Sequence, residues 1–87
     1  MKIKKGFMLR EVAGNFVVVA VGEASKKFNG VINLNESGAF LWKKLADGIE
    51  KEKLIDALLE EYEVSKEIAT ADIEKFIAKL KEADILE

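Results

Sequence analysis

The hydrophobic spacing of this sequence changes near residue 34, and that change indicates the fold class. Up to Leu34 the apolar side chains are mostly β-branched or aromatic, and turn-forming residues separate them. From Asn35 onward apolar residues recur every three or four positions, which is the spacing of one helical face. Strands followed by helices are typical of the α+β class. Because 87 residues suit one domain, we predict a single α+β domain over residues 1–87.

The first part of the chain predicts a three-stranded antiparallel sheet. Ala13-Gly14-Asn15 is predicted to be a turn, because glycine and asparagine tolerate positive φ. Residues 16–21 are apolar on both faces, as in a central strand, so the first and third strands should form the edges. Residues 22–29 are predicted to form a polar loop anchored by Phe28. The strands are predicted at residues 7–12, 16–21 and 31–34.

Three helices are predicted after the sheet, at residues 36–47, 50–62 and 66–83. Asn35 and Ser65 are good N-cap residues for the first and third helices. Trp42 lies on the apolar face of the first helix, so we expect it in the core. The third helix has one predicted core stripe with Ile77 at its margin, and that stripe consists of Ala69, Ile73, Phe76, Leu80 and Ala83.

The side chains available for chemistry are few. The sequence contains no histidine and no cysteine, which excludes the common nucleophile–base pairs and thiolate or imidazole metal sites. We therefore expect no enzymatic activity, no bound metal and no organic cofactor. The longest apolar run, residues 16–21, is far shorter than the roughly 20 residues of a membrane span. No signal segment follows Met1, so the expected location is the cytoplasm, without a membrane partner.

Charge is divided unevenly along the chain. Residues 1–34 carry six basic and two acidic side chains, whereas residues 35–87 carry eight basic and fourteen acidic ones. One candidate function is that of a winged-helix DNA-binding or regulatory protein, since a strand region with three helices can form a winged helix. It is kept as the alternative to the function considered below. Such proteins cluster lysines and arginines at the phosphates. Residues 66–87 hold six acids against four lysines, so we expect no nucleic-acid partner.

Four segments, in this order and spacing, resemble the sequence pattern of the PqqD-like family. Members of this family are recognition elements for ribosomally made, post-translationally modified peptides. The segments are residues 33–42 (NLNESGAFLW), 45–48 (LADG), 58–64 (LLEEYEV) and 72–80 (DIEKFIAKL). The resemblance implies three antiparallel strands followed by three helices, similar to a winged helix-turn-helix. It also implies a non-catalytic chaperone that binds the leader of a precursor peptide and presents it to a maturation enzyme, often a radical S-adenosylmethionine enzyme. Members from the quinone pathway usually carry prolines in the strand region, whereas this chain has none, which favours another peptide pathway.

The resemblance places the leader peptide between the third strand and the third helix. An edge strand presents unpaired N–H and C=O groups, so an extended peptide can pair with it, and a second copy of the chain could form a homodimer there. Two margins of the third helix remain possible, one with Thr70, Ile77 and Lys81 and the other with Asp72, Lys75 and Lys79. The candidate peptide-binding residues are Val31, Ile32, Asn33 and Leu34 on the strand and Thr70, Ile73, Ile77 and Lys81 on the helix.

Overall fold

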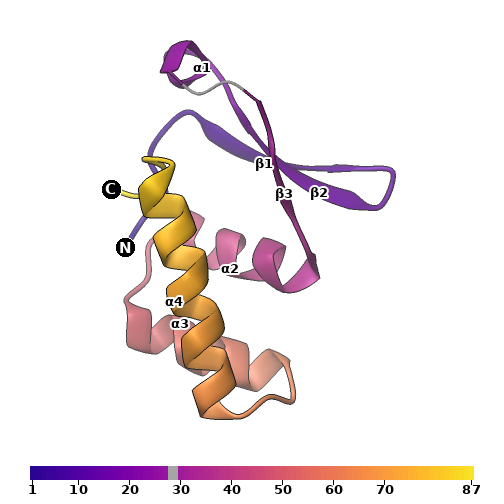
Figure 1. The fold of residues 1–87 in the computed structure, drawn as a ribbon, viewed down its shortest axis with the longest axis vertical. Coiled ribbons are helices and arrows are strands. Elements are labelled where there is room, and N and C mark those ends of the chain that lie inside the picture. The colour runs from indigo at the N-terminus through magenta and orange to yellow at the C-terminus, as the bar shows by residue number, and fades with distance from the viewer. Residues whose placement is uncertain (28–29) are drawn as a thin grey trace.

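The computed structural model describes residues 1–27 and 30–87, and it confirms an α+β fold in which three strands precede the main helices (Figure 1). The strands are β1 (Phe7–Val12), β2 (Asn15–Ala20) and β3 (Ile32–Leu34). The helices are α1 (Ala24–Lys27), α2 (Glu36–Ala46), α3 (Lys51–Glu61) and α4 (Lys66–Glu82). The short α1 was not expected and occupies part of the predicted polar loop. Phe28, the expected anchor of that loop, lies outside the described residues.

The three strands form one antiparallel sheet in the order β1-β2-β3, which confirms that β2 is central. Leu9, Val18 and Ile32 lie opposite one another across the sheet, and Val18 is fully buried. Side chains alternate between the two faces of a sheet, so this row points toward the helices. β3 is an edge strand whose outer side pairs with no other described strand.

The hairpin between β1 and β2 is tighter than the sequence predicts. Asn15 pairs with Val12 and begins β2, so only Ala13 and Gly14 form the loop. Both have positive φ, 52° for Ala13 and 82° for Gly14. Two-residue hairpins favour positive φ at both positions, because that backbone twist matches the twist of the paired strands. The turn was therefore predicted in the right place but one residue too long.

The core lies between the inner face of the sheet and the three long helices. Trp42 is only 3% exposed, which confirms its predicted place in the core. The two ends of the chain help to close this core, because Ile3 forms a bridge with Leu86 and both side chains are buried. Figure 1 shows the two ends side by side. Among the described residues no helix has both the length and the apolar character needed to cross a bilayer.

The orientation of α4 corrects one prediction about its core stripe. Ile77, expected at the margin, is 7% exposed and belongs to the core, whereas Phe76, expected in the stripe, is only partly buried. Both patterns satisfy helical spacing, since neighbouring residues lie about 100° apart around the axis. Tertiary packing decides between them: Ile77 joins Ile73 and Leu80 in the core, and Phe76 lines a cavity beside β3.

The chain enters β1 through a glycine that no other residue can replace without strain. Gly6 has a φ of 98°, and a Cβ at this position would lie 2.6 Å from the Cβ of Ala24. We expect Gly6→Ala to lower the free energy of unfolding by about 1–3 kcal/mol, because positive φ and the steric clash both disfavour alanine. Urea unfolding followed by circular dichroism measures the loss.

Gly14→Ala is the matched control, because Gly14 also has positive φ but a Cβ there would meet nothing within 4 Å. Its free energy of unfolding should fall by less than that of Gly6→Ala, because only the cost of positive φ for alanine remains. Equal losses for the two variants would show that the contact with Ala24 is unimportant.

Candidate functional site

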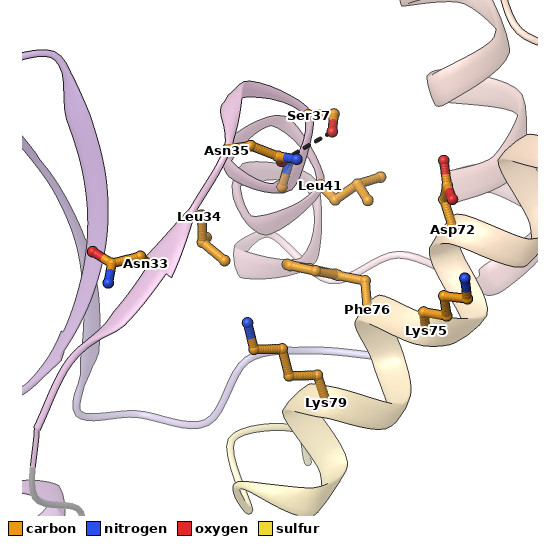
Figure 2. A pocket seen from close by; sticks show the side chains of 10 residues that line it. Asn33, Leu34, Asn35, Ser37, Leu41, Asp72, Lys75, Phe76 and Lys79 are labelled. Atoms are coloured by element: carbon orange, nitrogen blue, oxygen red, sulfur yellow. Dashed lines mark hydrogen bonds between the residues drawn. The ribbon is translucent and has the colours of Figure 1, made fainter.

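A groove of about 330 Å³ separates β3 and the start of α2 from α4 (Figure 2). We call it the strand–helix groove. Its walls come from segments that are far apart in the sequence, the β3–α2 corner on one side and the middle of α4 on the other. The lining residues are Asn33, Leu34, Asn35, Ser37, Gly38, Leu41, Asp72, Lys75, Phe76 and Lys79.

The β3–α2 corner is held by a helix cap. Asn35 is the single residue between the end of β3 and the start of α2, and its Oδ1 accepts hydrogen bonds from the Gly38 amide at 2.8 Å and the Ser37 hydroxyl at 3.0 Å. Asparagine suits this position because its side chain satisfies an amide that the helix leaves unpaired. A Cβ on Gly38 would lie 3.1 Å from that Oδ1 and 3.4 Å from the Cβ of Leu34. The glycine therefore lets the strand and the helix approach closely.

Apolar and charged side chains share the groove. Figure 2 shows Leu34 and Phe76 pointing toward each other across it, while Lys79 extends from α4 toward β3. Asp72 stands on the side of α4 that is nearer to Ser37 and Leu41 of α2, and the Lys75 side chain points away from β3. The ion pairs formed between residues of the described ranges do not involve Asp72, Lys75 or Lys79. The groove thus offers an apolar floor with charged groups that are free to pair with a ligand.

The structure brings only two of the predicted binding residues into this groove, Asn33 and Leu34. Ile32 is half-buried on the inner row of the sheet, and Val31 precedes β3 and is 56% exposed.

The residues predicted on the helix lie elsewhere on α4. Ile73 is fully buried, Thr70 is half-buried outside the groove lining, and Ile77 and Lys81 line a separate cavity beside Met1 and Lys51. Of the two margins left open by the sequence, the one with Asp72, Lys75 and Lys79 faces β3.

Sequence reasoning did not select Phe76 or the corner residues Asn35, Ser37 and Gly38 as site residues. The signal for the corner was available, because the segment 33–42 carries the family resemblance and contains all three. Phe76 was assigned to the core stripe, and only the rotation of α4 shows that its ring faces the groove.

The outer edge of β3 is open for backbone pairing. Its inner edge pairs with β2, and no backbone hydrogen bond joins the outer edge to another residue in the described ranges. Edge strands with free N–H and C=O groups readily accept an additional strand. Within residues 1–27 and 30–87 no group of three or more acidic side chains is arranged to hold a metal ion. The open outer edge of β3 therefore suits an extended polypeptide that lies along this strand.

Comparisons with known proteins agree with this geometry. The model of the family "Coenzyme PQQ synthesis protein D (PqqD)" matches residues 7–86. A structure of TbiB1 in complex with the TbiA(beta) leader peptide has a TM-score of 0.79 at 23% identity, covering 100% of this chain and 95% of that one. A structure of lasso peptide synthetase B1 complexed with a leader peptide has a TM-score of 0.72 at 22% identity, covering 93% of this chain and 89% of that one. A search of curated proteins gave no match.

The two structural likenesses show a shared fold over nearly the whole chain. The family match covers all elements from the start of β1 to Leu86, including both walls of the strand–helix groove. This chain therefore belongs to the PqqD family.

Proposed function

We propose that this domain binds the leader segment of a ribosomally made precursor peptide as a fourth strand along β3, within the strand–helix groove. The observation that carries the proposal is the open edge of β3 lying directly opposite the Phe76 margin of α4. Backbone hydrogen bonds to β3 would supply affinity that does not depend on sequence, and the groove side chains would supply selectivity. Two similar structures hold leader peptides, which supports the same role here.

The contact residues proposed on α4 differ from those expected from the sequence. Phe76 and Lys79 replace Ile77 and Lys81, because they line the groove beside β3. Leu34 remains the apolar contact proposed on the strand. A leader side chain between Leu34 and Phe76 would be removed from water on both sides, which favours an apolar residue there.

We further propose that the domain acts without catalysis and presents the peptide to a separate modifying enzyme, a radical S-adenosylmethionine enzyme in a pathway other than that of the quinone. The absence of histidine and cysteine from the sequence supports a non-catalytic role.

The open edge of β3 also permits a homodimer, so sedimentation with and without peptide should be measured. A dimer that dissociates when peptide is added would place both interactions on β3.

Amide chemical shifts test the binding mode directly. On titrating a leader peptide into the ¹⁵N-labelled domain, we expect the largest shifts in residues 32–38 and 72–79, with affinity in the micromolar range, roughly −8 kcal/mol. Ordering a flexible leader costs free energy, which is why tighter binding is not expected. Shifts that gather instead on the β1 edge, or on the basic residues Lys26 and Lys27 of α1, would contradict the proposed groove.

A further inference from the structure

A second cavity, of about 360 Å³, adjoins the strand–helix groove at the N-terminal end of α2. We call it the side pocket. Its apolar wall is formed by Leu58, Tyr62 and Val64, at the end of α3 and just beyond it. It shares Asn35, Ser37, Leu41 and Asp72 with the groove, so the two hollows lie next to each other. A peptide leaving β3 at its Leu34 end would pass directly into this space.

The side pocket is preformed. The Tyr62 ring packs edge-on against Phe40, with ring centroids 5.8 Å apart and planes at 87°. The ammonium group of Lys44 lies over the Phe40 ring, 5.5 Å from its centre. A wall that is fixed before binding loses little conformational freedom when a ligand side chain enters. The pocket is therefore suited to one bulky apolar side chain.

The two adjoining hollows carry opposite charges at their outer ends. Glu36 and Asp72 line the side pocket, and the pKa of Tyr62 is raised by partial burial and by the nearby carboxylates of Glu36 and Glu61. At the β3 end lies Lys79, whose side chain extends toward the strand (Figure 2). No ion pair among the described residues uses Lys79. A peptide that spans both hollows thus meets Glu36 and Asp72 at the side pocket and Lys79 at the β3 end, and it passes Lys75, which lines the groove but not the side pocket.

The direction of β3 relates these ends to the direction of the peptide. β3 runs from Ile32 to Leu34 toward α2, and the whole sheet is antiparallel. A fourth strand that continues the antiparallel pattern would begin beside the side pocket and run toward Lys79. We propose that the cognate leader carries a bulky apolar residue for the side pocket, followed toward its C-terminus by an acidic residue that pairs with Lys79. This inference rests on the proposed function, which it refines to a class of leader.

Selection from a random displayed peptide library tests the order of residues without knowledge of the natural leader. Peptides of about 12 residues span roughly 40 Å when extended, enough to cover both hollows. We expect the peptides enriched on the wild-type domain to share an apolar residue followed by aspartate or glutamate. Selection on Lys79→Glu should replace that acid by lysine or arginine. Lys81→Glu is the matched control, because Lys81 lies outside the groove, and it should leave the acid in place.

Measured affinities complete the test. Binding of a selected acidic peptide should weaken about tenfold or more on Lys79→Glu, and should recover when the peptide acid is changed to lysine. If selected peptides shift the amides of residues 32–34 but show no acid, or show the acid before the apolar residue, the inference is overturned while the proposed function stands. If no selected peptide shifts those amides, the proposed function fails and the inference fails with it.

Discussion

Replacing Trp42 with alanine is expected to lower the free energy of unfolding by about 3–5 kcal/mol, the usual loss when a buried aromatic ring is removed. The indole is 3% exposed and lies in the core with Leu41 and Leu45 of the same helix. The free energy of unfolding of a small domain is roughly 5–15 kcal/mol, so the variant would retain only part of its stability. Urea unfolding monitored by far-ultraviolet circular dichroism measures the change.

Val31→Ala is the control for Trp42→Ala. Val31 is 56% exposed and precedes β3, so its truncation should change stability by no more than about 0.5 kcal/mol. A loss below about 1 kcal/mol for Trp42→Ala would mean that the ring is not packed as described. The large difference between these two variants is the expected result.

Aspartate at Ile77 and aspartate at Phe76 are expected to have different consequences although the residues are neighbours. Ile77 is 7% exposed in the core, so Ile77→Asp loses buried apolar surface and places a carboxylate in an apolar site. We expect this variant to lose at least about 3–5 kcal/mol, enough to unfold much of the population. Phe76→Asp alters a partly buried ring at the groove, so the fold should survive and peptide binding should fall.

Two measurements distinguish the effects of Ile77→Asp and Phe76→Asp. Circular dichroism reports the fold of each variant, and titration with a selected peptide reports binding by those that are folded. Met8→Asp serves as the surface control, because Met8 is 44% exposed on β1, away from the groove, and should bind as the wild type does. A folded Ile77→Asp variant with weakened binding would support the other margin of α4 instead.

The fold was largely predictable because local signals specify it. The change of spacing near residue 34, the glycine turn between β1 and β2, and the caps Asn35 and Ser65 each mark a boundary that the structure confirms within two residues. Asn35 and Ser65 both accept the capping hydrogen bond that their positions predicted. The helix α1 carries no comparable local signal, since its four residues include no buried side chain.

The candidate site was only partly predictable because it depends on how α4 is rotated. The spacing of apolar residues restricts a helix to one face but leaves about 100° of uncertainty at each margin. Packing of α4 against α3 and the rest of the core, which are distant in sequence, places Ile77 inward and leaves Phe76 toward β3. The spacing of apolar residues within α4 fits either rotation. The sequence therefore predicted the strand wall of the groove better than its helix wall.

The bridge between Ile3 and Leu86 has a consequence for synthesis on the ribosome. Residues from the two ends complete one core: the Lys4 amide donates to Ile85, the Glu87 amide donates to Lys2, and Ile85 is fully buried. Contacts between positions so distant in the chain form late, and they lower the rate of folding. While residues 85 and 86 remain inside the exit tunnel, Ile3 lacks its bridge to Leu86 and this part of the core stays open. This part of the core therefore closes only once residues 85 and 86 have left the tunnel.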